Sequence, residues 1–132
     1  MASIKLQIKR AYEPVTDSDG ERYLVDRLWP RGVRKNAMKL TGWLKGVAPG
    51  SALRVWFGHD PARWETFRRR YRKELQSNLD SLQPLRSALT RGAVTLVYAA
   101  HDEQHNHAVV LREFLLGLPR SLRKKQATHT RS

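Results

Sequence analysis

Residues 23–32 read Tyr-Leu-Val-Asp-Arg-Leu-Trp-Pro-Arg-Gly. The first three residues are apolar and predict a short buried strand, and Asp26 and Arg27 follow where that strand ends. Charged groups next to a buried strand are costly unless they are paired or used to bind something. The segment therefore predicts either a structural ion pair between Asp26 and Arg27 or part of a functional site, which Arg31 extends.

A second apolar segment lies at residues 93–100 and reads Ala-Val-Thr-Leu-Val-Tyr-Ala-Ala. It stands between two helical patterns, which is typical of a strand buried on both faces in a parallel sheet. Residues 3–9 alternate apolar and polar side chains and predict the first strand. The Asp19-Gly20 pair would permit a hairpin between the first two strands. We favour the parallel arrangement, because it brings several polar clusters to one edge.

Helices are expected where apolar residues recur every three or four positions. These segments are 37–46, 52–57 with Ser51 as N-cap, 61–77 with Asp60 as N-cap, a further helix ending near residue 91, and 107–116. The expected fold is α/β, a single compact domain with a small, mainly parallel sheet of about three to four strands flanked by helices. We assign this domain to residues 1–117 and expect the basic tail, 118–132, to be disordered.

Composition limits the cellular setting. The 132 residues contain 40% apolar residues, which is enough for one core, and no cysteine. The absence of cysteine excludes thiolate catalysis, disulfides and cysteine-ligated zinc, and it is compatible with a reducing cytoplasm. No apolar run is long enough for a membrane span, and no signal-peptide block is present, so we expect a cytoplasmic protein without a membrane partner.

The chain is strongly basic, with a formal net charge of +13 from 25 Lys and Arg against 12 Asp and Glu. The tail from residue 118 contributes five cations and no acid, which leaves +8 on residues 1–117. Such a charge attracts polyanions and anionic metabolites, although it would also arise from a requirement for solubility alone.

Polar residues follow each predicted strand. The first strand leads to Arg10 and Tyr12, the second leads to the acid and base described above, and the third leads to His101, Asp102 and Asn106. The carboxyl ends of parallel strands share one edge, where ligands bind in open α/β sheets. We therefore expect a site there, close to the amino terminus of the last helix.

The residue types at this edge suggest acid–base chemistry and anion binding. Asp26, Asp102 and His101 are the catalytic candidates. Arg10, Arg27 and Arg31 are suited to clamp a phosphate or carboxylate, with Tyr12 and Asn106 orienting the ligand. Structural alternatives stay open. Asp102 and Asn106 would also serve as caps of a helix, and His101 would also be an ordinary loop residue.

The segment 53–61 contains three more candidate ligand-binding residues. Arg54, Trp56 and His59 are able to clamp or stack on an aromatic ligand such as a nucleic acid base. The alternative is that the tryptophan fills the core.

Four potential metal ligands lie within seven residues: His101, Asp102, His105 and His107. They fall in a predicted loop or at its end, and no His-Glu-x-x-His motif is present, so we expect no metal site. Neither a glycine-rich phosphate loop nor a serine nucleophile elbow occurs, and we expect no cofactor.

Several motifs occur in an order that resembles a known family. They are Lys9-Arg10-Ala11-Tyr12-Glu13-Pro14, Asp19-Gly20, residues 24–32, Trp43, Ala48-Pro49, Leu53-Arg54, Trp56-Phe57, His59-Asp60-Pro61, Trp64, Phe67, Arg70-Tyr71, residues 94–100 and Asn106. Together they resemble the DUF488 family, in the short subgroup that includes the YeaO-like proteins, over about residues 4–116. The resemblance implies a compact cytoplasmic bacterial α/β protein and no known activity.

Longer members of that family resemble this chain but have Cys-His-Arg after the buried strand. The corresponding residues here are His105-Asn106-His107, so a thiol-based activity does not carry over.

Two functional hypotheses follow. The first is a protein that binds or acts on a small ligand bearing a phosphate or carboxylate, such as a nucleotide, at the strand ends. The alternative is a nucleic-acid-binding module without sequence specificity, in which the arginine-rich helix 61–77 and the basic tail contact phosphates. A third, regulation of a partner protein, has no positive support in the sequence, and nothing indicates the oligomeric state.

Overall fold

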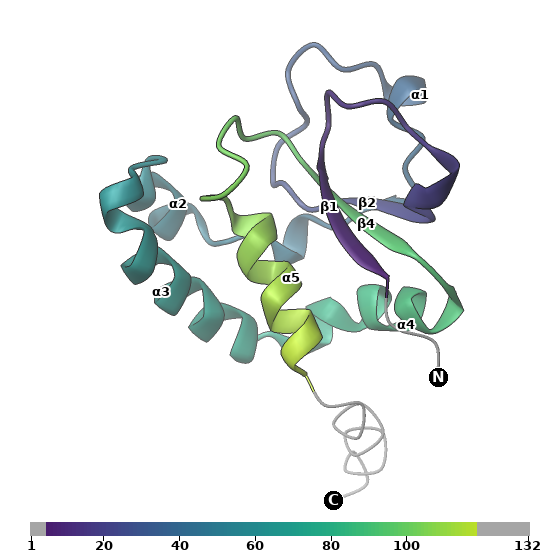
Figure 1. The fold of residues 1–132 in the computed structure, drawn as a ribbon. Coiled ribbons are helices and arrows are strands. Elements are labelled where there is room, and N and C mark those ends of the chain that lie inside the picture. Colours follow the sequence, from purple (N-terminus) through teal and green to yellow (C-terminus); the bar gives the residue numbers. More distant parts are fainter. Residues whose placement is uncertain (1–4, 119–132) are drawn as a thin grey trace, which may run out of the picture.

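The computed structural model describes residues 5–118 and contains one four-stranded sheet with helices around it (Figure 1). The strands are β1 (Leu6–Arg10), β2 (Glu21–Leu24), β3 (Gly42–Trp43) and β4 (Val94–Tyr98), and their order in the sheet is β1-β4-β2-β3. All three neighbouring pairs are parallel. The predicted α/β fold is confirmed, and no hairpin joins β1 to β2 because β4 lies between them.

Strand β4 is the centre of the sheet. All five of its residues are buried, as expected for an apolar and β-branched strand covered on both faces. Its neighbours continue the ladder past their own ends. The Ala11 N–H donates to the Tyr98 carbonyl at 2.7 Å, and the Val25 N–H donates to the Val97 carbonyl at 3.0 Å. The chain therefore stays in register up to the edge where the predicted site lies.

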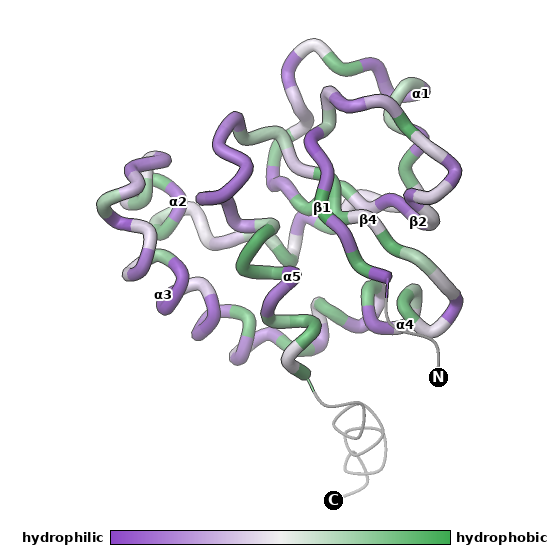
Figure 2. The backbone as a smooth tube through the Cα atoms, in the orientation of Figure 1, coloured by the Kyte–Doolittle hydropathy of each residue, from purple (hydrophilic) through white to green (hydrophobic). Residues whose placement is uncertain are grey.

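Four helices cover one face of the sheet: α2 (Ser51–Phe57), α3 (Trp64–Gln76), α4 (Gln83–Arg91) and α5 (His107–Gly117). Short 3-10 turns stand at Asp17–Asp19, Lys45–Val47, Pro61–Arg63 and Leu79–Leu82. Buried side chains from these helices form the main core with β1, β2 and β4. Figure 2 shows that α5 is mostly apolar along its length, whereas α3 alternates polar and apolar residues, as expected for an amphipathic surface helix.

The other face of the sheet has a thinner cover. It consists of the short helix α1 (Lys35–Met38) and the irregular chain around it. Met38 packs there against Leu24 and Val97, and Trp29 meets Trp43 edge to face, with ring centroids 5.4 Å apart. The segment after β2 therefore crosses to this second face, whereas the segment after β4 continues to α5 on the first.

A buried polar network also lies on this second face. Asp19 is 1% exposed and accepts hydrogen bonds from Lys9 at 2.9 Å, Thr16 at 2.8 Å and Arg22 at 2.7 Å. Burial acts to raise the pKa of Asp19, but the hydrogen bonds, led by that of Lys9, outweigh burial and lower the pKa to about 2. The carboxylate thus fixes the turn before β2 to β1 and β2.

The helix predicted at residues 37–46 is wrong. The chain there forms α1, which ends where Lys39 takes a left-handed conformation with φ 47°, followed by the edge strand β3. The Thr41 N–H and the Leu44 N–H donate to backbone carbonyls of β2 at 2.6 and 2.8 Å. Pairing with the edge of β2 satisfies these backbone groups and overrides the apolar spacing.

Other boundaries shift by a few residues. Helix α2 begins at Ser51 with Gly50 as its N-cap, so the predicted cap at Ser51 is wrong. The Asp60 side chain does accept a hydrogen bond from the Ala62 N–H at 3.0 Å, as predicted, but the first turn is 3-10 and α3 begins at Trp64. None of the helices in residues 5–118 is long and apolar enough to cross a membrane. Most of the tail expected to be disordered lies outside the described residues.

Candidate functional site

A pocket of about 570 Å³ lies at the carboxyl ends of β2 and β4. The connections that follow these two neighbouring strands leave toward opposite faces of the sheet. Such a switch point creates a crevice in parallel sheets, and ligands of open α/β proteins bind there. The position of the pocket therefore follows from the topology.

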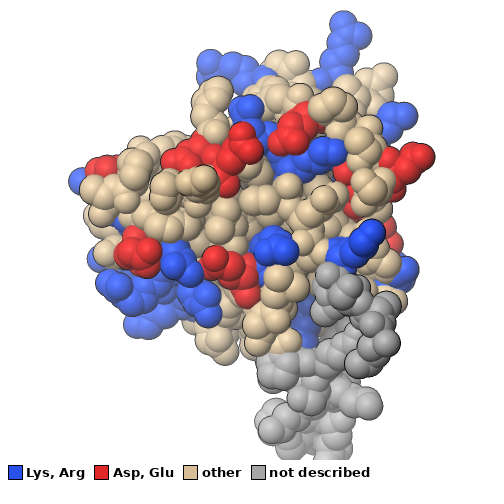
Figure 3. All heavy atoms as spheres, viewed as in Figure 1, with Lys and Arg blue, Asp and Glu red and all other residues tan. Residues whose placement is uncertain are grey.

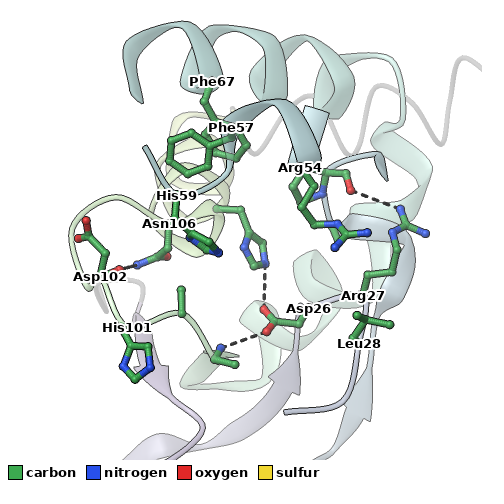
Figure 4. Close-up of a pocket in the computed structure, with 15 residues that line it drawn as sticks. Asp26, Arg27, Leu28, Arg54, Phe57, His59, Phe67, His101, Asp102 and Asn106 are labelled. Carbon is green, nitrogen blue, oxygen red and sulfur yellow. Dashed lines mark hydrogen bonds and ion pairs between the residues drawn. The ribbon is translucent and has the colours of Figure 1, made fainter. Parts of the chain in front are cut away.

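Fifteen residues line the pocket, and seven of them are predicted site residues. These seven are Asp26, Arg27, Arg54, His59, His101, Asp102 and Asn106. The other polar residue is His107, and the apolar lining comes from Leu28, Ala48, Pro49, Phe57, Phe67, Ala99 and Ala100. In the view of Figure 4, Arg27 and Arg54 lie on one side of the pocket, and Phe57 and Phe67 lie on the other. A largely apolar wall with a few convergent polar groups is typical of a ligand site.

Asp26 is tied to two neighbouring elements (Figure 4). Its Oδ2 accepts a hydrogen bond from the Ala99 N–H at 3.1 Å, and its Oδ1 lies 3.2 Å from His107 Nε2. The same Nε2 lies 3.0 Å from the Val25 carbonyl oxygen, which can only accept, so Nε2 carries the proton. The alternative of an Asp26–Arg27 ion pair is not observed, because the carboxylate pairs with α5 instead.

The two arginines of the pocket have few partners. The Arg27 Nη2 lies 3.5 Å from the Pro49 carbonyl oxygen, at the limit for a hydrogen bond. Its Nε is buried and has no hydrogen-bond partner among the described residues. Arg54 is exposed on α2, and its side chain has no ion pair or hydrogen bond within residues 5–118. Neither guanidinium group is therefore fully satisfied by the described residues.

The loop between β4 and α5 is held by its own side chains. Asp102 Oδ1 accepts hydrogen bonds from the Gln104 and His105 N–H groups, both at 2.9 Å, and Oδ2 lies 2.9 Å from His105 Nδ1. The Gln104 hydrogen bond contributes most to lowering the pKa of Asp102. Asn106 is 1% exposed and caps α5, because its Oδ1 accepts from the Val109 N–H at 3.1 Å. The structural alternative is therefore observed for Asn106, which caps α5, whereas Asp102 holds the loop before the helix and does not cap it. Both residues also line the pocket.

The end of α2 supplies the aromatic part of the wall. Phe57 and Phe67 are stacked with centroids 4.3 Å apart, and both are buried. His59 follows two residues after the helix, with its ring centroid 6.0 Å from that of Phe57. Its backbone is left-handed, with φ 57°, which is uncommon for a residue other than glycine. His59 is also exposed, so its ring is available at the rim.

Four predicted ligand-binding residues do not line the pocket. Arg10 lies behind its wall, where Nε donates to the Ala100 carbonyl at 2.9 Å and Nη2 lies 3.4 Å from His101 Nδ1. Tyr12 donates its hydroxyl to the Arg31 carbonyl at 3.0 Å, and the Arg31 side chain is exposed. These contacts position the loops around the site.

Trp56 is the fourth predicted ligand-binding residue outside the pocket. It is half-buried and packs against the main core, as expected from the alternative that this tryptophan fills the core. The guanidinium groups of Arg63 and Arg70 lie over its ring, 5.1 and 4.8 Å from the centroid. Trp56 therefore joins α2 to α3 and does not contact the pocket.

The charged groups of the pocket differ in how many protein partners they have. The two carboxylates, Asp26 and Asp102, are each paired with a histidine. Neither Arg27 nor Arg54 forms an ion pair with an acid in the described part of the chain. Among the described residues, the two guanidinium groups are therefore the charged groups of the pocket with the fewest protein partners.

Histidines at the end of β4 are not arranged as a metal site. His101 faces Arg10, His105 contacts Asp102, and His107 contacts Asp26. Within residues 5–118 no three histidine or acidic side chains are grouped closely enough to hold a metal ion.

Basic side chains gather over α3 on the surface seen in Figure 3. Most of these cations have partners. Arg68 donates to Glu113 at 2.8 Å and approaches Glu65 at 3.5 Å, and Arg72 lies 6.0 Å from the centroid of Phe114. Of the six cations in residues 61–77, Arg69 and Lys73 have no such contact with a described residue.

The partner of Asp26 was not among the predicted site residues. The sequence suggests His107 only as a potential metal ligand, although its position at the start of the helix after the buried strand places it at the same edge. That signal would have found it, because parallel strand ends and the helix starts that follow them share one edge.

Comparisons with known proteins place the chain in a family. The family model DUF488-N3i, described as "Inactive DUF488-N3 subclade", matches residues 5–132. The chain is 40% identical over 113 residues to uncharacterized protein Rv3073c of Mycobacterium tuberculosis (strain ATCC 25618 / H37Rv), covering 86% of this chain and 95% of that protein. It is 38% identical over 115 residues to uncharacterized protein YeaO of Escherichia coli (strain K12), covering 87% and 100%.

No solved structure matches the chain significantly. The resemblance to the DUF488 family and its YeaO-like members is confirmed by the family model and by both relatives. The chain belongs to the DUF488 family, in the DUF488-N3 subclade that is described as inactive.

Proposed function

We propose that the pocket binds a small anionic ligand carrying a phosphate or carboxylate group, and that it does so without catalysing a reaction. The observation that carries the proposal is that the two arginines of the pocket leave most of their donors without protein partners among the described residues. Both carboxylates in the pocket have histidine partners, whereas the guanidinium groups of Arg27 and Arg54 have no acidic partner among the described residues. An oxyanion between these two groups would accept the hydrogen bonds that they do not make to the protein.

The chemistry of the two arginines supports an oxyanion ligand. A guanidinium presents a planar set of N–H donors that matches two oxygens of a phosphate or carboxylate. Arg27 has a buried Nε and a single long contact through Nη2, so its position is set by packing and its donors are underused. A hydrogen bond to a charged group typically contributes about 1.5–3 kcal/mol, which is enough for millimolar binding with two such groups.

Binding without catalysis is favoured by the residues present. The described residues that line the pocket include no hydroxyl, thiol or amine side chain that would act as a nucleophile. Asp26 accepts a hydrogen bond from the Ala99 N–H through Oδ2, and its Oδ1 lies 3.2 Å from His107 Nε2 without a hydrogen bond. Asp102 is held by its own loop. The description of the DUF488-N3 subclade as inactive also favours binding without catalysis.

Titration with inorganic phosphate at low ionic strength, followed by thermal unfolding and calorimetry, tests the proposal. We expect Arg54→Ala to raise the dissociation constant about tenfold, from the loss of one charge-assisted contact. The matched control is Arg69→Ala, which removes an exposed arginine of α3 outside the pocket. The dissociation constant of the control variant for phosphate should stay within about twofold of that of the unaltered protein. Equal effects of the two changes, or no binding by the unaltered protein, would refute the proposal.

The nucleic-acid alternative has weaker support. Four of the six cations on residues 61–77 are engaged by Trp56, Phe114 or acidic side chains, which leaves Arg69 and Lys73 for phosphates. If α3 were the polyanion surface, Arg69→Ala would weaken the binding of phosphate and of a single strand more than Arg54→Ala does. The affinity of the Arg69→Ala variant for the strand would also depend less steeply on salt concentration than that of the unaltered protein.

A further inference from the structure

The pocket is larger and more apolar than a simple anion requires. Its volume of about 570 Å³ is in the range of sites that enclose drug-sized ligands, and most of the surface that lines it is apolar although eight of the fifteen lining residues are polar. A free phosphate would contact the two arginines and leave the apolar wall in water. Given the proposed function, the anionic group therefore belongs to a larger ligand with an apolar or aromatic body.

One segment supplies both a cation and an aromatic ring. Arg54 and Phe57 are three residues apart in α2 and so lie on the same side of the helix. The helix ends at Gly58, whose N–H donates to the Arg54 carbonyl at 3.1 Å, and the next residue is His59. This arrangement places an imidazole ring next to Phe57 and within the same pocket as the guanidinium.

The backbone at His59 has an unusual conformation. Gly58 and His59 are both left-handed, with φ 50° and 57°, and the second of these is disfavoured for a side chain with a Cβ. This conformation turns the chain directly after α2, and the exposed His59 side chain lines the pocket. Phe57 and Phe67 are buried, whereas His59 is exposed, so of these three rings only that of His59 is open to a ligand.

We propose that the ligand is a nucleoside monophosphate, with its heteroaromatic base stacked on His59 and its phosphate held by Arg27 and Arg54. This inference rests on the proposed function. It adds a second recognition element, because base stacking is separate from the charge interaction. A base with a phosphate is the chemistry of a free nucleotide and also of the 5′ end of a nucleic acid strand.

The test compares three probes with the full-length protein: AMP, ribose 5-phosphate and inorganic phosphate. We expect AMP to bind about tenfold more tightly than ribose 5-phosphate, because only AMP has a base to stack. His59→Asn removes the ring but tolerates a left-handed backbone, and it should abolish the advantage of AMP. His59→Phe retains a ring and should preserve it. Thermal unfolding of both variants establishes that they are folded.

The outcomes separate the two proposals. If none of the three probes binds, the proposed function fails, and this inference fails with it. If AMP and ribose 5-phosphate bind equally, or if His59→Asn leaves the advantage of AMP intact, anion binding stands and the inference is overturned. Tighter binding of a 5′-phosphorylated oligonucleotide than of AMP would assign the site to a strand end, and the opposite order would assign it to a free nucleotide.

Discussion

Replacing Asp19 with asparagine removes the charge at the centre of the buried network behind β1 and β2. The side chain keeps its shape, but Lys9 and Arg22 lose their common counter-charge while their side chains remain 15% and 3% exposed. Breaking a buried ion pair by changing one partner typically costs about 3–5 kcal/mol. We expect Asp19→Asn to reduce the free energy of unfolding at neutral pH by at least about 2 kcal/mol.

The pH dependence gives the electrostatic part of this loss. The pKa of Asp19 is lowered from 3.8 to about 2 in the folded protein, so the folded state favours the ionised form by about 2 kcal/mol. Because the folded pKa is the lower one, this stabilisation is fully present above pH 3.8. It is lost as the pH falls through about 2. The difference in stability between the unaltered protein and Asp19→Asn should therefore shrink by about 2 kcal/mol between neutral pH and pH 2.

Urea denaturation at a series of pH values measures this difference. The pKa of Glu21 is also lowered to about 2, chiefly by its hydrogen bond with Arg91, but Glu21 titrates in both proteins and cancels. Asp17→Asn is the matched control, because Asp17 is an exposed aspartate in the same turn. A loss no larger than that of the control, or a difference that does not change with pH, would refute the electrostatic account of this network.

Three further substitutions test the fold around the site by urea denaturation. Gly20→Ala should cost at least about 2 kcal/mol, because φ is 66° and the added Cβ would collide with the Ala93 carbonyl. Asn106→Ala should cost about 1–2 kcal/mol, because α5 loses its N-cap. Tyr71→Phe should cost about 1–3 kcal/mol, since the Val47 carbonyl loses a buried hydrogen bond. Effects below about 0.5 kcal/mol would contradict these assignments.

Elements with a strong local signal were predictable from the sequence. The apolar run at residues 93–100 identified the central strand, and the spacing from Trp64 to Leu75 identified α3. Polar residues after two apolar strands indicated the edge where the pocket lies, and Asp26 and Arg27 are among the residues that line it. In these segments, periodicity and tertiary burial agree, so local pattern was sufficient.

Other features depend on contacts between distant parts of the chain. Strand β3 has two residues and forms because it pairs with β2, so the apolar spacing of residues 37–46 suggested a helix instead. The pairing of Asp26 with His107 joins positions 81 residues apart, which sequence spacing does not reveal. Arg10 and Tyr12 end β1 as expected, but their side chains bond to neighbouring loops and do not enter the pocket.

The most direct test of the anion site is to observe the arginine side chains themselves. Proton–nitrogen NMR of the Nε–H groups should be recorded while inorganic phosphate is added to the full-length protein. We expect the signals of Arg27 and Arg54 to shift together with one dissociation constant, while that of Arg69 stays unchanged. Shifts that begin at the arginines of α3 and leave Arg27 and Arg54 unaffected would contradict the assignment of the anion to this pocket.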